Sequence, residues 1–419
     1  MNILMMTNTY KPLVGGLEKS VELFSHEFRK SGHRVVIVCP TFEGMKREKD
    51  VVRIPAMQHF NGSDFSIQLP IPGILAQALG NFKPDIVHAH HPFFIGDTAL
   101  RVASNYNVPL VFTHHTLYEQ NVHYVPGNQE ALKRFVIELS TGYANLADQV
   151  FAPSESIMQL MIERGVETPI EVVPTGIYLN KFSRGAGKAF RQQCGIQDPK
   201  AFVVGSVGRL ALEKNLEFLT RAVVQFLKKV SQAHFLVCGQ GPLEESIREI
   251  AQQHGVAERV HFGGVLQGKA LNAGYHAMDV FAFASQSETQ GLVVTEAIAS
   301  GVPVVAVDAP GVREVIKDTV HGRLLPHESI EDFVCGLEWV HTQSAAQLKA
   351  LKRNCRERAQ DFSMPKCAEK VLKKYQELSI RQGFVRRASE ESRWASTARL
   401  IHAQWDLVKN LTKAAGAML

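Results

Sequence analysis

The residues best suited to chemistry lie in the segment 288–296, which begins with Glu288 and ends with Glu296. Gly291 between them permits a close backbone approach, and a helix is expected to begin just after it. The unpaired N–H groups of a helix's first turn attract an anion, and carboxylates accept paired hydrogen bonds from vicinal hydroxyls. A ligand with both a diphosphate and hydroxyls is a sugar nucleotide. The alternative is that Glu296 is an ordinary first-turn carboxylate, which stabilises a helix by about 0.3–1 kcal/mol.

Two cations, Arg209 and Lys214, follow the strand expected at residues 202–208. A guanidinium forks onto a phosphate and an ammonium adds a point charge, so the pair suits a diphosphate leaving group that gains negative charge as its bond breaks. A solvated basic loop is the alternative. Because this loop and the segment 288–296 both follow strands of one predicted sheet, we expect them to share a ligand.

The first half of the chain offers two weaker candidates. Gly15 and Gly16 precede a helix, where their amides can approach a phosphate or a sugar, although a tight turn explains them about equally well. His114 and His115 end a predicted strand and are better placed for ligand contact than for core packing. The polar and aromatic loop that follows them contains Tyr118, Glu119, His123 and Tyr124.

A metal site is not expected. His88, His90 and His91 suggest one, but no carboxylate stands at ligand spacing from them. The chain also has no Asp-x-Asp pair, which usually holds a divalent ion that bridges a diphosphate. We therefore expect no metal and no other cofactor, and Arg209 and Lys214 would neutralise the leaving group.

Continuously apolar strands alternate with helical patterns along the chain, as in parallel sheets covered on both faces. The expected strands are 2–7, 33–39, 86–88, 109–113, 149–152, 170–173, 202–208, 235–239, 260–263, 280–283 and 304–307. The predicted fold class is α/β, with two Rossmann-like doubly wound domains facing a cleft, the usual place for a small-molecule ligand. The polar stretch 181–200 is expected to link a first domain, 1–180, to a second, 201–375, and a tail follows at 376–419.

The tail is predicted to be a cationic amphipathic helix. Its apolar positions recur at alternating spacings of four and three: Trp394, Ala398, Ile401, Trp405, Val408, Thr412 and Ala415. Its other faces carry Arg393, Arg399, Lys409 and Lys413. Such a helix either lies in an anionic bilayer surface, packs on the body of the protein, or packs on a second copy.

Composition limits the other classes of protein. The six cysteines show neither disulfide-framework nor metal-ligand spacing, which indicates reduced thiols. No signal peptide and no apolar run of the ~18 residues needed to span a bilayer are found. A cytoplasmic protein is expected, peripheral on the inner face of the membrane if the tail binds lipid. The net charge of +5 lies mostly in the tail and forms no basic stripe, which argues against nucleic-acid binding.

Taken together, these motifs and the segments 15–18, 83–90 and 173–177 resemble the retaining glycosyltransferases of family 4, which have the GT-B fold, over about residues 1–374. The resemblance implies that Glu296 holds the ribose hydroxyls, that Glu288 contacts the donor sugar, and that Arg209 and Lys214 bind the diphosphate. It also implies that the Gly15–Gly16 loop lies near that diphosphate and that His115 lies close to the reacting sugar. The remaining substrate-binding residues implied are Gly263 and Val265, near a uracil base, and Gly291, Leu292 and Val293. Gln290 departs from the family, which commonly has an aromatic residue there.

A narrower similarity concerns the acceptor. Residues 115–124 look like the acceptor-side loop of bacterial diacylglycerol glucosyltransferases. This implies transfer of a hexose from a nucleotide diphosphate sugar, with UDP as the expected nucleotide, to a lipid such as diacylglycerol, with retention. Three alternatives stay open: a polysaccharide or soluble glycan acceptor, a sugar-nucleotide epimerase, and a non-catalytic sugar-nucleotide-binding subunit.

Overall fold

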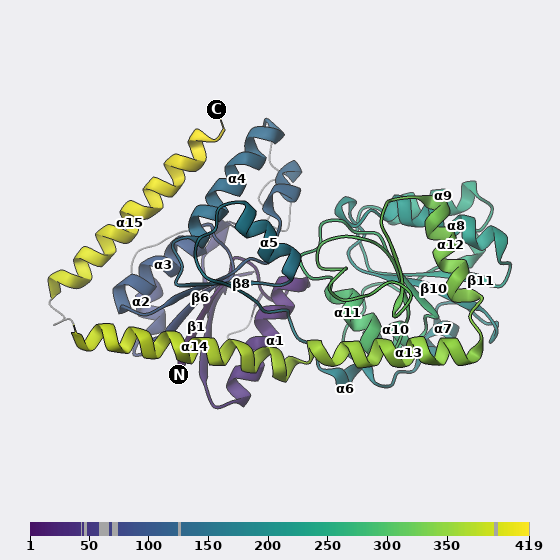
Figure 1. Cartoon of the computed structure of the whole chain (residues 1–419), viewed down its shortest axis with the longest axis horizontal. Coiled ribbons are helices and arrows are strands. Elements are labelled where there is room, and N and C mark those ends of the chain that lie inside the picture. The colour runs from purple at the N-terminus through teal and green to yellow at the C-terminus, as the bar shows by residue number, and fades with distance from the viewer. Residues whose placement is uncertain are drawn as a thin grey trace. The chain divides into compact units, whose positions relative to one another are not determined.

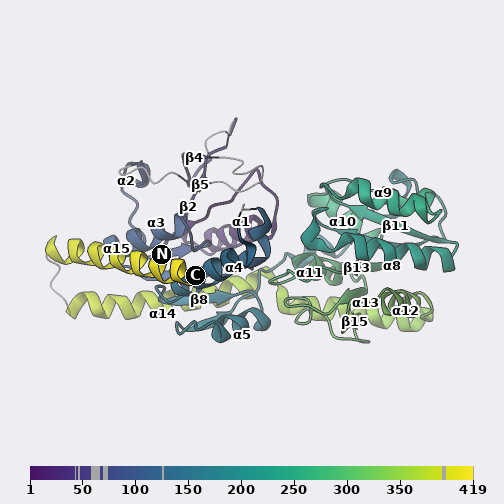
Figure 2. The same cartoon turned by 90° about the horizontal axis from the view of Figure 1, so that it is seen from above.

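The structure is a computed structural model that describes residues 1–42, 44–45, 48–57, 67–68, 74–124, 127–388 and 393–418. At 67–68, 74, 76, 121, 123–124, 384–388 and 393–394 it describes the backbone alone. The side chains of His123, Tyr124, Arg393 and Trp394, named above, therefore lie outside the described part. The chain forms two compact units, Met1–Gly176 with Met364–Leu419, and Ile177–Ser363 (Figure 1, Figure 2).

The first unit contains a parallel sheet with strand order β3-β2-β1-β6-β7-β8-β9 in the described residues. Its strands are β1 (Asn2–Met6), β2 (Arg34–Pro40), β3 (Val51–Ile54), β6 (Ile86–Ala89), β7 (Leu110–Thr113), β8 (Gln149–Ala152) and β9 (Ile170–Val172). The helices before the C-terminal segment are α1 (Gly16–Lys30), α2 (Ile74–Leu79), α3 (Ile95–Tyr106), the 3-10 helix η2 (Tyr118–Tyr124), α4 (Gln129–Ala144) and α5 (Glu155–Glu163). Ile3, Leu4, Met5 and Met6 are fully buried in succession, which requires cover on both faces of the sheet.

The second unit repeats this architecture with strand order β12-β11-β10-β13-β14-β15. Its strands are β10 (Phe202–Val207), β11 (Ala233–Cys238), β12 (Val260–Phe262), β13 (Val280–Phe283), β14 (Val304–Val307) and β15 (Gly322–Leu325). Its helices are α6 (Leu179–Phe182), α7 (Gly187–Gln193), η3 (Leu212–Lys214), α8 (Leu216–Lys229), α9 (Glu244–Gln253), η4 (Ala257–Arg259), α10 (Gly268–His276), α11 (Leu292–Ala299), α12 (Ile330–His341), α13 (Ala345–Ala359) and η5 (Gln360–Phe362). Both units are doubly wound, as predicted. Of the strands, β3, β15 and the short antiparallel pair β4 (Ala56–Met57) and β5 (Ile67–Gln68) were not predicted.

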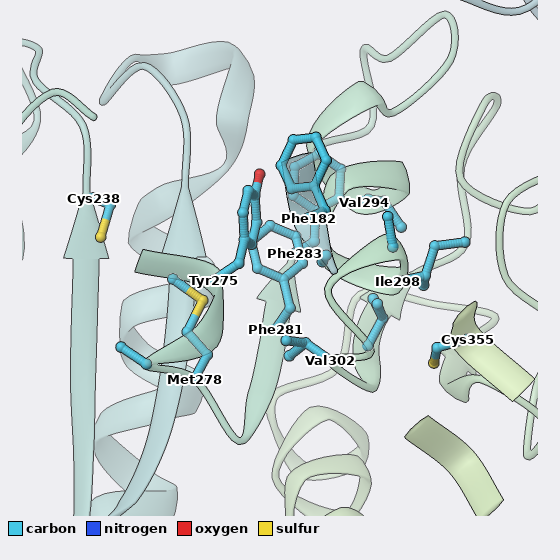
Figure 3. Close-up of a cluster of buried hydrophobic side chains, with 14 of the residues drawn as sticks. Phe182, Cys238, Tyr275, Met278, Phe281, Phe283, Val294, Ile298, Val302 and Cys355 are labelled. Atoms are coloured by element: carbon cyan, nitrogen blue, oxygen red, sulfur yellow. The ribbon is translucent and has the colours of Figure 1, made fainter. Parts of the chain in front are cut away.

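The stretch 181–200 is not a linker, so that prediction was wrong. It includes α7, and its residues Phe182, Phe190 and Ile196 are buried in the main core of the second unit. The Phe182 ring lies 6.1 Å from the Tyr275 ring, and both point into the cluster that contains Phe281 (Figure 3). The polar residues of this stretch concealed the apolar side of a short helix.

The predicted boundary at residue 375 cuts through a helix of the first unit. Helix α14 (Met364–Ala388) packs on α1, and its Tyr375 is fully buried. The Tyr375 ring lies 5.7 Å from that of Phe28, and its hydroxyl hydrogen-bonds to Nδ1 of His88. The C-terminal segment therefore begins at Met364 and belongs with the first unit.

Helix α15 (Arg393–Gly416) ends this segment and packs on α3 and α4 (Figure 1). It does so with Ala403, Leu407 and Ala414, none of which belongs to the apolar stripe identified from the sequence. That stripe is exposed at Ile401 and Trp405. Across the described residues, no helix is both long and apolar enough to cross a bilayer.

Candidate active site

The second unit places its functional loops at a point where the strand order reverses. β10 pairs with β11 on one side and with β13 on the other, so the loops after β10 and β13 leave the same edge in neighbouring positions. In open parallel sheets, such a switch point is where ligands bind. The loop after β10 carries Arg209 and Lys214, and the loop after β13 carries Glu288 and Gly291.

Lys214 and Glu288 are in direct contact across this switch point. Lys214 Nζ lies 2.6 Å from Glu288 Oε1, and the side chains are 26% and 16% exposed. The hydroxyls of Ser285 and Ser287 both donate to the backbone oxygen of Glu213 at 3.1 Å, which ties the two loops together. The structure thus brings together the two segments that we expected to share a ligand.

Arg209 also has a carboxylate partner. Its guanidinium donates to Glu213, whose side chain is buried, while about half of the Arg209 side chain is exposed. Asn215 then turns the chain into α8 with a left-handed backbone, φ 53°. The loop therefore presents its two cations already paired with acids, an arrangement in which an incoming diphosphate competes with carboxylates for the same donors.

Glu296 is not a first-turn helix carboxylate. Helix α11 begins at Leu292, so Glu296 lies in its second turn, and it is buried with 3% of its surface exposed. The hydroxyl of Tyr275, itself fully buried, donates to Glu296 Oε2 at 2.9 Å. Burial, followed by the charge of Glu296, holds the pKa of Tyr275 well above its usual value, so the hydroxyl stays protonated and remains a donor. Tyr275 could not be recognised as this partner from the sequence, because the two residues are 21 positions apart.

Gly291 is the N-cap of α11 and has a left-handed backbone, φ 70°. Leu292 and Val293 form the half-buried first turn. The loop before them packs closely against the backbone at Gly311, where an added Cβ would lie 2.5 Å from the backbone nitrogen of Gln290. Gly311 also has φ 79°, so both the close approach and the backbone favour glycine there.

Gly263 and Val265 follow β12 at the same edge of the sheet. The amide of Gly263 donates to the Val237 carbonyl at 2.8 Å, and Val265 is 54% exposed. An added Cβ at Gly263 would lie 2.9 Å from Cys238 Sγ, so packing explains this glycine. Val265 is an exposed apolar side chain at a ligand-binding edge, which suits contact with a flat base.

The first unit has its own switch point, between β1 and β6. The amide of Asn8, just after β1, donates to Nδ1 of His91, just after β6, at 3.1 Å. Gly15 is the N-cap of α1 with an extended backbone, and a Cβ at Gly16 would meet nothing within 4 Å. Neither glycine has a positive φ, so the backbone conformation alone does not require glycine at either position.

His115 is coupled to a second histidine. Its Nε2 lies 2.9 Å from Nδ1 of His90, and the two rings stack with centroids 5.2 Å apart. Burial, with the neighbouring histidines adding to it, lowers the pKa of both far below the usual value, so both are neutral at pH 7 and one donates to the other. They border a cavity of about 10 Å³, the room of one water molecule, together with His88 and Thr113.

His114 and Glu119 are structural, in contrast to what the sequence suggested for His114. His114 is 3% exposed and packs edge-on against Phe112 and Tyr118. Glu119 is buried and pairs with Arg164 at 2.6 Å. The strand end at 113–116 therefore directs one histidine into the core and leaves the other, His115, partly exposed.

No three histidine, cysteine, aspartate or glutamate side chains form a group that could hold a metal ion among the residues that the structure describes. His88, considered above as a ligand, instead bonds Thr113 Oγ1 at 2.7 Å through Nε2 and Tyr375 through Nδ1. Burial lowers its pKa to about 3. His88 is therefore a neutral imidazole with both nitrogens hydrogen-bonded inside the first unit, which is a structural role.

Two family models match the chain in succession. Residues 14–181 match Glycosyltransferase Family 4, and residues 188–362 match Glycosyl transferases group 1. The chain is 32% identical over 331 residues to the alpha-monoglucosyldiacylglycerol synthase of Streptococcus pneumoniae. The matched region covers 77% of this chain and 75% of that protein. The chain therefore belongs to the family 4 glycosyltransferases.

Other similarities are broader. A GDP-mannose-dependent alpha-mannosyltransferase of Mycobacterium tuberculosis is 29% identical over 77% of this chain and 83% of its own length. The crystal structure of Anabaena HepE in complex with UDP superimposes with a TM-score of 0.71 at 22% identity, covering 90% of this chain and all of that one. The fold is the GT-B fold, as predicted, and the protein is a glycosyltransferase.

Proposed function

We propose that the protein transfers a hexose from a UDP-linked sugar to a lipid acceptor such as diacylglycerol, with retention at the anomeric carbon. The observation that carries the donor half of the proposal is the Lys214–Glu288 contact at the switch point, next to a helix that presents Glu296. The name of the pneumococcal relative supports a lipid acceptor, and HepE, with UDP bound, supports the nucleotide.

The roles follow from charge and position. Lys214 and Arg209 stabilise the diphosphate as negative charge develops on it. Glu288 then accepts hydrogen bonds from sugar hydroxyls, and Glu296, oriented by Tyr275, accepts them from the ribose. The amides at Gly291, Leu292 and Val293 face the diphosphate from the helix N-terminus. Gly263 and Val265 contact the base.

In the reaction, the bond between the anomeric carbon and the diphosphate oxygen breaks, and its electron pair leaves with the diphosphate. A bond from the acceptor hydroxyl oxygen to the anomeric carbon replaces it. The hydroxyl proton passes to an oxygen of the leaving phosphate. His115, neutral and oriented by His90, contacts the reacting sugar, and the Gly15–Gly16 amides approach the diphosphate. The cations Arg209 and Lys214 take the place of a metal in this proposal.

The test is a donor and acceptor panel. The purified protein is incubated with uridine, guanosine and adenosine diphosphate sugars, with and without diacylglycerol vesicles, and release of the nucleotide diphosphate is measured. Release that requires both a UDP-sugar and diacylglycerol supports the proposal. Release with GDP-mannose would indicate the donor named for the mycobacterial relative, and release without lipid would indicate a glycan acceptor in place of a lipid. Donor isomerisation without an acceptor would indicate an epimerase, and tight binding without turnover a binding subunit.

A further inference from the structure

Helix α15 has two apolar faces, and only one of them is covered. Ala403, Leu407 and Ala414 are buried, and the first two belong to the apolar core of the first unit. At about 100° of turn per residue, these three lie within about 40° of one another around the helix axis. Ile401, Trp405, Val408 and Thr412 lie about 140–200° from Ala403, on the opposite side.

The outward face is strongly apolar. Ile401 is 64% exposed, Trp405 57% and Val408 44%. Leu411 is also exposed, but at about 80° from Ala403 it lies between the covered face and the outward face. A row of exposed large apolar side chains on one element marks an interaction surface, because isolated ones are common but contiguous ones are not.

The rotation of the helix is fixed by polar contacts on its inner side. Arg399 donates to the Ser104 carbonyl at 3.0 Å, and Asn410 donates to the Leu139 carbonyl at 3.0 Å. Gly142 of α4 allows the closest approach, since a Cβ there would lie 1.8 Å from Asn410 Oδ1. Arg134 donates to the carbonyl of Ala417 at the end of the helix. The Trp405 side of α15 cannot turn inward without breaking these contacts.

The charge beside the apolar face is positive. Lys409 lies 5.6 Å from the centre of the Trp405 ring, and Lys413, one turn later, keeps most of its side chain exposed while pairing with Glu138. Asp406 is the single acidic residue in the sequence of the helix. A tryptophan among aliphatic side chains, flanked by lysines, is the arrangement that binds the interface of an anionic bilayer.

We propose that the outward face of α15, defined by Ile401, Trp405 and Val408, docks the protein on an anionic lipid bilayer. The helix lies in the interface with its inner face still packed on α3 and α4, so the first unit is carried to the membrane as a body. Both family models end by residue 362, so neither implies a role for this helix. Docking goes beyond the proposed function, since it requires no particular donor or acceptor.

The test is flotation of the full-length protein with vesicles of phosphatidylcholine alone or mixed with phosphatidylglycerol. We expect binding to the anionic vesicles, weakening as salt is raised, and a loss of about tenfold or more in partitioning for Trp405→Ser. Ile162→Ser is the matched control, because Ile162 is an exposed apolar residue of α5 in the same unit. It should float like the unaltered protein. Circular dichroism and the thermal midpoint check that both variants are folded.

Two outcomes would overturn the proposal. One is flotation of folded Trp405→Ser at the level of the unaltered protein. The other is a concentration-dependent dimer in size-exclusion chromatography that Trp405→Ser converts to monomer while lipid binding is absent, which would assign the face to a second copy. Flotation does not measure transfer, so a protein that floats but does not glycosylate diacylglycerol would contradict the proposed acceptor and leave docking intact.

Discussion

Replacing Glu288 by glutamine should reduce turnover sharply while leaving the fold intact. The change keeps the side chain's shape but removes the charge that Lys214 Nζ meets at 2.6 Å. At an effective dielectric constant of about 20, two unit charges about 4 Å apart attract by about 4 kcal/mol. Desolvation and ordering of the side chains reduce this to the net range of charge-assisted hydrogen bonds, about 1.5–3 kcal/mol. If that free energy is lost from the transition state, kcat falls about 10- to 150-fold.

The assay is release of UDP from the active donor, measured for Glu288→Gln, Lys214→Met and the double variant. Because each single change leaves its partner's charge unpaired, we expect the double variant to lose less than the product of the two single losses. Glu338→Gln is the control, since Glu338 pairs with Lys229 at 2.8 Å in the same unit, between α12 and α8. It should change kcat by less than twofold, as expected for an exposed pair worth about 0–1 kcal/mol that lies outside the proposed site.

Near-normal kcat in folded Glu288→Gln would refute the reasoning. A fall in thermal stability with unchanged kcat would also contradict it, because the Lys214–Glu288 pair would then only hold the two loops together. Strictly multiplicative losses would show that the two residues act separately, and the shared-ligand interpretation of the switch point would be abandoned.

Three further predictions concern buried groups, one in the second unit and two in the first. Tyr275→Phe removes the donor to Glu296 without changing packing volume, so donor KM should rise about tenfold or more, and an unchanged KM would count against Glu296 as a ribose ligand. His90→Asn should lower kcat about three- to tenfold with little change in KM, because it frees the ring of His115, and rate loss through KM alone would argue against that positioning role. Burial lowers the pKa of His91 to about 3, so the unfolded chain binds a proton below pH 6.5 that the folded chain refuses. The free energy of unfolding should therefore fall as pH falls from about 6.5 toward 3, by up to about 1.4 kcal/mol per pH unit from this group. Urea unfolding measured across this pH range should show a weaker dependence of that free energy on pH for His91→Gln than for the unaltered protein.

The strands of the sheets could be predicted because a strand buried on both faces is a continuous run of apolar residues. β13 (Val280–Phe283) and β14 (Val304–Val307) lie where the sequence placed them. The place of the stretch 181–200 in the core could not be predicted, since its apolar residues are spaced among polar ones. Phe182 and Phe190 lie in short helices, and Ile196 follows the second of them. The boundary near 375 failed for a related reason: nothing in the composition of α14 shows that Tyr375 enters the core of the first unit.

The candidate site divides in the same way. Arg209, Lys214 and Glu288 are recognisable from the sequence because they are charged residues directly after strands of one sheet. Their distant partners are not, since the Tyr275 hydroxyl is brought to Glu296 by tertiary packing, and His90 meets His115 from a neighbouring strand 25 residues earlier. The loop glycine Gly311 supports Gln290 from a distance of 21 residues, and no local pattern announces that contact. The residues that we propose to contact the ligand therefore leave a local signal in the sequence, whereas the residues that orient them are recognised only from the fold.

Helix α15 shows how residue size misleads a search for the buried face. Its covered side includes two small residues, Ala403 and Ala414, and Gly142 of α4 lets Asn410 of the same helix approach closely. Its exposed side carries Ile401 and Trp405, which are far more apolar and therefore define the periodic stripe. A soluble protein normally buries its large apolar residues and leaves alanine outside. The docking that we propose would account for this reversal, because a bilayer gives the large apolar residues a second apolar environment and an anionic surface pairs with the lysines next to Trp405.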